Sequence, residues 1–268
     1  MDKKDINPFA PKNSNPVPAF AGMTNGQIPE IDNTAPMDAR RNVISFADVA
    51  ARYEKGHEIL SDVSFNINSH SFYFLSGASG AGKTTLLRLI YQLHPQSRGQ
   101  IKLFGKSTTG MDRDAVTDAR RKMAIVFQEY SLISHLSVFD NIALPLRVRG
   151  ADEKHVKKLV TRTLEWVGLS QYANAAPLSL SGGQQQKVAV ARAIITQPEI
   201  LLADEPTGNL DDESAAKLME MFVQMNKSFG TAIILATHSQ NLMNTYKFPR
   251  IMVADHHVRF VGATGTNF

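Results

Sequence analysis

Residues 71–85 read SFYFLSGASGAGKTT, a short apolar run that leads into a glycine-rich loop and then into a helical pattern. The loop at residues 77–85 fits G-x-x-x-x-G-K-[ST], in which glycines let backbone amides turn inward around phosphate oxygens. A strand, such a loop and a helix in this order are typical of α/β proteins that bind phosphates at a helix N-terminus. The stretch therefore predicts an α/β fold with a mainly parallel sheet and a nucleotide site beside it.

Two side chains of the loop have expected roles in nucleotide binding. We expect Lys83 to reach the β- and γ-phosphates and the Thr84 hydroxyl to help hold Mg²⁺. The helical pattern continues through LLRLIYQL at residues 86–93. A glycine-rich turn without a ligand is the alternative, and the lysine and threonine argue against it. The residues expected to bind nucleotide here are Gly77, Ala78, Ser79, Gly80, Ala81, Gly82, Lys83, Thr84 and Thr85.

Three further β-rich runs end in polar side chains. EILLADEP places Asp204 and Glu205 after a strand, KMAIVFQEY places Gln128 after another, and TAIILATH places His238 after a third. Ligands bind at the carboxyl edge of parallel strands, so we expect these side chains to meet there. Asp204 would join Thr84 at the metal, and the Gln128 amide, which does not titrate, could bind the metal or the catalytic water. Glu205 would act on the attacking water, and His238 would contact the γ-phosphate. Taken singly, each is more often a structural strand end.

A second glycine-rich helix start reads LSGGQQQKVAVARA at residues 180–193. Ser181, Gly182, Gly183 and Gln184 precede an apolar helical pattern, and a serine with glycine amides at a helix N-terminus can hold an anion. The chain's own nucleotide is already assigned to residues 77–85. The second segment therefore raises the question of which other phosphate it binds.

Composition narrows the class of protein further. The chain has 268 residues, a formal net charge of +4 and no cysteine, which excludes disulfides and thiolate metal sites. The mild positive charge does not by itself indicate nucleic acid and suits an anionic membrane face equally well. No apolar run approaches the length that spans a bilayer, so we expect a soluble protein. Residues 1–41 are rich in proline and asparagine and are predicted to be a disordered tail before a domain at 42–268.

These elements together resemble the nucleotide-binding domain of ABC transporters. The phosphate loop, Gln128, LSGGQ at residues 180–184, LLADEP and His238 match that family in order and spacing over residues 42–262. The resemblance implies the ABC ATPase fold, with a P-loop NTPase core, an antiparallel β subdomain and an α-helical subdomain at about 129–180. It also implies that the helical subdomain docks on a membrane partner.

The resemblance further implies ATP and Mg²⁺ as ligands and ATP hydrolysis as the reaction. Tyr53 falls where the family places an aromatic residue that stacks on adenine, although a core tyrosine in a strand is the plainer interpretation. Residues 181–184 would bind the γ-phosphate held by a second copy, giving a head-to-tail homodimer. Residues 207–212 correspond to a loop that crosses this interface. No nucleic acid is expected as a partner.

Within the family, LLADEPTGNLD resembles a subgroup that includes the FtsE-type cell-division ATPases, the LolD-type lipoprotein-release ATPases and the MacB exporters. The segment SVFDNIALPLRVRGA most resembles the FtsE type within that subgroup. This implies an integral membrane FtsX-like permease as partner and a peripheral place on the cytoplasmic face of the cell membrane. The alternatives are an export ATPase of the LolD or MacB type, a soluble ABC ATPase without a membrane partner, and an ATP-binding scaffold with little turnover. The sequence departs from the family at residues 68–71, at Lys187 and at Ser239.

Overall fold

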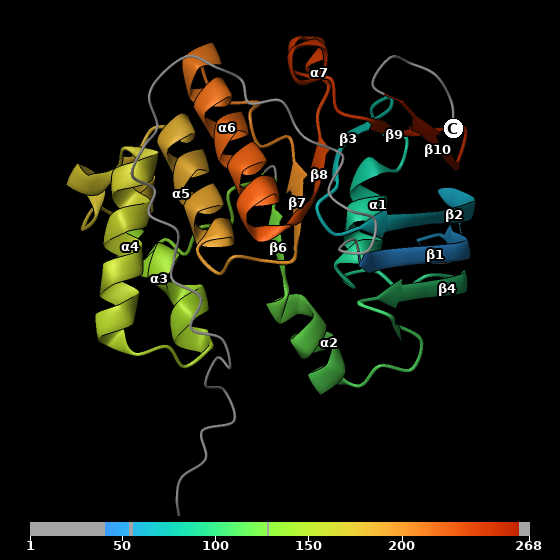
Figure 1. The fold of residues 1–268 in the computed structure, drawn as a ribbon, viewed down its shortest axis with the longest axis horizontal. Helices are drawn as coiled ribbons and strands as arrows, with labels where there is room; N and C mark the ends of the chain where they lie inside the picture. The colour runs from blue at the N-terminus through green and yellow to red at the C-terminus, as the bar shows by residue number, and fades with distance from the viewer. Residues whose placement is uncertain (1–40, 54–55, 128, 263–268) are drawn as a thin grey trace, which may run out of the picture. The chain divides into compact units, whose positions relative to one another are not determined.

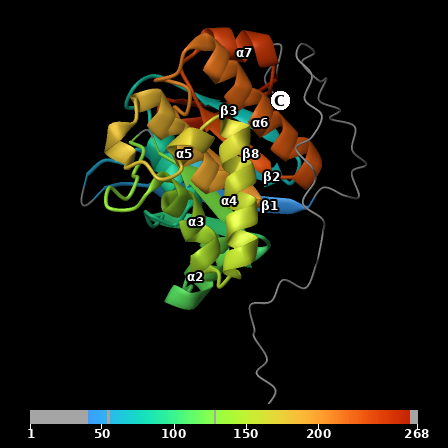
Figure 2. The same ribbon diagram turned by 90° about the vertical axis from the view of Figure 1, so that its left-hand side faces the viewer.

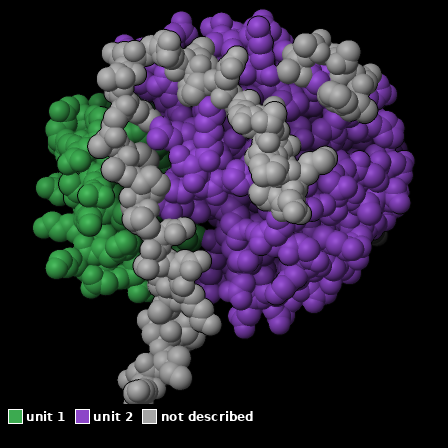
Figure 3. All heavy atoms as spheres, in the orientation of Figure 1, with its two compact units in different colours: residues 1–28, 132–196 green, residues 29–131, 197–268 purple. Residues whose placement is uncertain are grey.

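The computed structural model describes residues 41–53, 56–127 and 129–262, which form two compact units. Unit 1 is described over residues 132–196 and unit 2 over the remaining described residues, as coloured in Figure 3. The predicted disordered tail lies outside the described residues except for Arg41. None of the described helices is long and apolar enough to cross a membrane.

Unit 2 is built on a six-stranded sheet with the order β10-β9-β3-β8-β7-β6 (Figure 1). Every neighbouring pair is parallel except β10 with β9, and β7 and β8 are buried along their whole length. Continuous apolar runs suit such strands because helices cover both faces of a parallel sheet. The prediction of a mainly parallel α/β core is confirmed. The strands are β3 (Phe72–Ser76), β6 (Met123–Val126), β7 (Ile200–Asp204), β8 (Ala232–Ala236), β9 (Arg250–Ala254) and β10 (His257–Val261).

A second, antiparallel sheet in unit 2 has the order β2-β1-β4-β5. Buried and exposed residues alternate along β2, as expected for a sheet with one covered face. Phe46 of β1 stacks on Phe65 of β2 with ring centroids 4.6 Å apart. The strands are β1 (Asn42–Ala51), β2 (Leu60–Asn68), β4 (Arg98–Leu103) and β5 (Lys106–Ser107).

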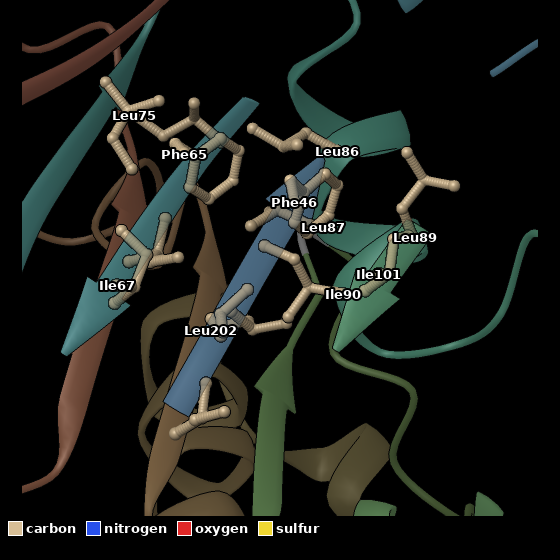
Figure 4. Close-up of a cluster of buried hydrophobic side chains, with 14 of the residues drawn as sticks. Phe46, Phe65, Ile67, Leu75, Leu86, Leu87, Leu89, Ile90, Ile101 and Leu202 are labelled. Carbon is tan, nitrogen blue, oxygen red and sulfur yellow. The ribbon is translucent and has the colours of Figure 1, made fainter. Parts of the chain in front are cut away.

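One hydrophobic cluster joins this sheet to the helix that follows the phosphate loop (Figure 4). Phe46 lies there with Leu86, Leu87 and Ile90 of α1 (Lys83–Ile90) and with Leu202 of β7. Burying each such side chain contributes roughly 1.5–3 kcal/mol. Packing against residues of both sheets therefore fixes the helix that follows the phosphate loop. The other helices of unit 2 are α2 (Arg113–Arg121), α6 (Asp212–Phe229) and α7 (Gln240–Tyr246).

The helix α1 is shorter than its sequence pattern predicts. It ends at Ile90, and Gln92 has the left-handed φ of 58° instead of a helical one. Arg120 of α2 donates hydrogen bonds to the carbonyl oxygens of Tyr91 and Gln92, at 3.1 and 2.7 Å. A guanidinium thus satisfies carbonyls at the helix end, which the apolar spacing alone could not reveal.

The turn at residues 68–71 forms without the residues usual in the family. His70 takes a left-handed φ of 62°, its amide donates to the Gly230 carbonyl at 2.8 Å, and the Ser71 hydroxyl donates to the Asn68 carbonyl at 2.6 Å. The turn therefore delivers the chain into β3 despite the departure in sequence.

Unit 1 is helical. Its helix α4 is amphipathic: Val156, Val160 and Leu164 are buried, whereas Lys157 and Lys158 are exposed. Asp152 caps its N-terminus, and Gly168 with φ of 70° ends it. Figure 2 shows α3 beside α4, and α3 also packs on α5. The elements are α3 (Val138–Val148), α4 (Glu153–Val167), α5 (Gly182–Ile194) and the short 3₁₀ helices Ser170–Tyr172 and Pro177–Ser179.

Replacing the buried Asn141 with alanine should destabilise the protein by about 2–4 kcal/mol, because several partly buried backbone groups would lose their partner. The fully buried Asn141 side chain accepts from the Ile133 amide at 2.8 Å and donates to the Ile133 and Ser137 carbonyls, both at 3.0 Å. Urea unfolding measures the loss. The exposed Asn174→Ala in the same unit is the control, and equal losses in the two variants would contradict the assignment.

A charged cluster between α3 and the start of α4 should make unit 1 sensitive to acid. Arg147 donates to an Asp140 carboxylate oxygen at 2.7 Å and to both oxygens of Glu153 at 2.7 and 3.2 Å. The Ser137 hydroxyl and then Arg147 lower the pKa of Asp140, and Arg147 lowers the pKa of Glu153. Lowered pKa values stabilise the fold above the unfolded-state pKa, and this contribution is lost as pH falls through the folded-state values.

The expected size of this acid effect is modest because all three side chains are at least about a third exposed. Between pH 6 and pH 3, the wild type should lose roughly 1–3 °C more in melting temperature than Arg147→Gln does. Thermal unfolding across this pH range measures it. Arg162→Gln on the exposed face of α4 should behave like the wild type. Parallel pH profiles for wild type and Arg147→Gln would contradict the prediction.

Candidate nucleotide site

The phosphate loop connects β3 to α1 within unit 2. Gly77 has a φ of 149°, and a Cβ at this position would lie 2.3 Å from the Val253 carbonyl oxygen. Gly82 precedes α1 with a left-handed φ of 108°, where a side chain would be strained. Both glycines are therefore required by the path of the loop, and the path turns the backbone around the start of α1.

Two side chains of the loop have defined partners. The Lys83 ammonium donates to the Gly77 and Ala78 carbonyls at 2.8 and 3.0 Å, so it lies inside the curve of the loop. The Thr84 hydroxyl donates to a carboxylate oxygen of Asp204 at 2.8 Å. Asp204 stands at the end of β7 and is 7% exposed. The structure thus brings together the hydroxyl and the carboxylate that the sequence predicts for the metal.

The donor set at this point suits Mg²⁺. Mg²⁺ prefers oxygen ligands and is usually held by one or two carboxylates together with substrate phosphates. Thr84 and Asp204 supply a hydroxyl and a carboxylate oxygen, and the described residues contain no cluster of three or more His, Asp or Glu that would form a complete protein cage. Gln128, the third predicted ligand, lies outside the described residues.

Glu205 and His238 form a pair beside this point. Glu205 has a left-handed φ of 50°, and its amide donates to the Ala236 carbonyl at the end of β8 at 3.0 Å. Its Oε1 lies 2.8 Å from the His238 Nδ1. The His238 side chain is 80% exposed and the Glu205 side chain only 14%. The hydrogen bond to Ala236 and the contact with His238 hold Glu205 in this conformation.

A cavity of about 320 Å³ opens next to the Glu205–His238 pair. Ser239, which departs from the family pattern, lies on its wall and caps α7 by accepting a hydrogen bond from the Leu242 amide at 3.3 Å. Its wall also includes residues of α6, α7, the 207–212 loop and the segment after β8, namely Thr207, Gly208, Leu210, Asp212, Ala215, Ala216, Thr237, Asn241, Leu242, Thr245 and Tyr246.

Tyr53 lies just beyond the end of β1 and is 39% exposed, so it is not a core tyrosine within a strand. Its hydroxyl is 3.3 Å from the Thr85 hydroxyl of α1. The sequence therefore pointed to a residue that reaches the phosphate loop's helix. Sequence reasoning missed two contacts, because His94 belongs to no motif and the motif at 207–212 does not reveal the partner of Asn209. His94 packs on Tyr53 with ring centroids 4.3 Å apart, and Asn209 donates to the Tyr130 hydroxyl at 2.8 Å.

Ser181 begins α5 in unit 1 and is exposed. Its hydroxyl accepts from the Gln184 amide at 3.3 Å, and the Gln184 side-chain oxygen accepts from the Ser181 amide at 2.9 Å, which completes a capping box. The amides of Gly182 and Gly183 open the helix and have no acceptor within it. This end of α5 can therefore donate hydrogen bonds to an anion.

The sequence pattern of ABC transporters matches residues 60–208 of the chain. The chain belongs to the ABC transporter family. Among ABC proteins, the chain is 37% identical over 216 residues to the cell division ATP-binding protein FtsE of Escherichia coli K12, covering 81% of this chain and 97% of that protein. The FtsE of Bacillus subtilis 168 is 36% identical over 213 residues, covering 80% and 93%.

A solved ABC structure supports the same conclusion. The dimeric ATP-binding cassette MJ0796 bound to ADP and phosphate has a TM-score of 0.77 and 32% identity, covering 82% of this chain and 98% of its own. The predicted ABC ATPase fold is confirmed. As an ABC ATPase, the chain binds nucleotide and hydrolyses ATP.

Proposed function

We propose that this ABC ATPase is the energy-supplying subunit of an FtsEX-like complex, which acts on a membrane partner that regulates cell-wall hydrolysis in cell division. The observation that carries this proposal is the 37% identity that extends over 97% of the FtsE of E. coli. The segment at residues 137–151 is the one whose sequence most resembles the FtsE type. It includes α3 of unit 1.

The residues of the nucleotide site have separate roles in ATP binding and hydrolysis. Residues 77–85 hold the phosphates and Tyr53 the adenine, while Thr84, Asp204 and Gln128 would hold Mg²⁺. The metal, when bound, neutralises charge on the phosphate oxygens. Glu205 orients and deprotonates the attacking water. Its small exposed fraction and its contact with His238 at 2.8 Å support this role, because a base must be held in one direction.

The working unit would be a homodimer with ATP at its interface. Ser181 and the amides of Gly182 and Gly183 would bind the γ-phosphate held by the partner subunit, and Gln184 would keep Ser181 in place through the capping box. The described dimers of MJ0796 support such an assembly. Because ATP contacts both copies, it favours the closed dimer over the open one, and hydrolysis removes this preference.

The membrane partner would be an integral FtsX-like permease that docks on the helical subdomain, predicted at about 129–180. The ATPase itself would then lie on the cytoplasmic face of the membrane through that partner. No nucleic-acid partner is proposed.

Affinity purification from solubilised membranes tests the proposal. The tagged full chain with ATP should recover a four-span membrane protein with a large extracytoplasmic domain. Lys217→Ala, an exposed change on α6, is the matched control and should recover the same protein. Recovery of a lipoprotein-release or exporter permease instead, or of no membrane protein, would overturn the division role while leaving ATP hydrolysis unaffected.

A further inference from the structure

A histidine outside every motif lies against the tyrosine assigned to adenine. The rings of His94 and Tyr53 have centroids 4.3 Å apart and planes inclined at 38°. The His94 Nε2 is also 3.0 Å from the Arg52 carbonyl oxygen. A carbonyl oxygen only accepts hydrogen bonds, so Nε2 carries the hydrogen in this contact. One imidazole therefore contacts both the Tyr53 ring and the backbone immediately before it.

These contacts hold Tyr53 along α1. Its hydroxyl lies 3.3 Å from the Thr85 hydroxyl in the first turn of α1, and its ring packs on His94, which follows the C-terminal end of the same helix. The phosphate loop leads directly into α1. A ring fixed at both ends of this helix is fixed relative to the phosphate loop.

We propose that His94 is a positioning residue for the nucleotide base. It packs on the Tyr53 ring from one side and orients the remaining surface of that ring to stack on adenine. Tyr53 is still 39% exposed, which leaves ring surface for a ligand. A ring held in place loses less conformational freedom when it binds, so affinity increases. This inference rests on the proposed role of Tyr53.

The size of the effect follows from the strength of aromatic packing. Aromatic contacts of this kind correspond to about a 2- to 10-fold change in affinity. The change should appear in KM and not in kcat, because the base is far from the bond that breaks and its contacts are equal in ground and transition states. Purines should be affected more than pyrimidines, since they offer a larger stacking surface.

Steady-state ATP hydrolysis by the full chain tests the inference. His94→Ala should raise KM for ATP by about 2- to 10-fold with kcat within about twofold of the wild type, and it should raise KM for CTP less. His94→Phe keeps a ring and should restore KM, whereas His94→Gln keeps only a hydrogen-bond donor and should resemble His94→Ala. His155→Ala, an exposed change on α4, is the control.

Each possible change in KM supports or overturns the proposed role of His94. An unchanged KM in His94→Ala would overturn the inference. A lowered KM would also overturn it, because it would mean that His94 obstructs binding of the base. Restoration by His94→Gln and not by His94→Phe would also overturn it. Tyr53→Ala tests the proposed role of Tyr53 separately from that of His94. If Tyr53→Ala leaves KM for ATP unchanged, Tyr53 does not bind adenine. If Tyr53→Ala raises KM and His94→Ala does not, only the role of His94 fails.

Discussion

Replacing Glu205 with glutamine is expected to lower ATP turnover by about 10²–10⁴-fold and to leave ATP binding intact. Glutamine has nearly the same size and can still hydrogen bond to His238, but it cannot take a proton from water. Because ATP would persist at the interface, the variant should remain as a dimer when ATP is present. Phosphate release measures turnover, and gel filtration with and without ATP measures dimer formation.

The control for this experiment is Glu220→Gln, which changes an exposed carboxylate on α6 in the same unit. It should show wild-type turnover and should not form a persistent dimer. Wild-type turnover by Glu205→Gln would remove Glu205 from the role of base, whatever its position beside His238.

Replacing Ser181 with arginine is expected to abolish dimer closure and turnover while leaving ATP binding by the monomer. The serine is exposed at the start of α5, where a phosphate of the partner subunit's ATP is proposed to bind. The larger side chain would fill that space. Loss of the cap alone should cost only about 1 kcal/mol of stability. Asp152→Ala removes the cap of α4 in the same unit and should keep its turnover.

A mixing experiment shows whether Ser181 acts across two copies. Lys83→Ala, which disables the phosphate loop, should be inactive alone. A heterodimer of Lys83→Ala with Ser181→Arg contains one site with an intact phosphate loop from one copy and an intact Ser181 from the other. We expect ATP-dependent heterodimers and partial recovery of turnover. If both residues served one site within the same copy, the mixture would remain inactive and would not associate.

The core of the fold was predictable because its signals are local. The apolar runs at β3, β7 and β8 are short and continuous, and each leads into a residue of the site at the same sheet edge. The phosphate loop is recognisable because only glycine permits the backbone path at Gly77 and Gly82. The order of the motifs along the chain then identified the fold as that of an ABC ATPase.

Contacts made by tertiary packing could not be predicted in the same way. Arg120 ends α1 through carbonyls that lie 28 and 29 positions earlier in the chain. The Asn209–Tyr130 hydrogen bond spans 79 positions, and the contact between His94 and the Arg52 carbonyl spans 42. Neither the sequence around these residues nor the motif that contains Asn209 indicates which partners they contact. Their partners follow from where α1, α2 and the loops lie after the sheets have formed.

The capping box at Ser181 has a consequence for the proposed closing and opening of the dimer. A hydroxyl has one hydrogen to donate and two lone pairs that accept. The Ser181 oxygen accepts from the Gln184 amide, so its own hydrogen is still available to a phosphate oxygen. Ligand binding and helix capping therefore use different parts of the same group and do not compete. At the proposed dimer interface, the start of α5 would therefore bind and release a phosphate as a rigid contact, with no turn of helix to wind or unwind.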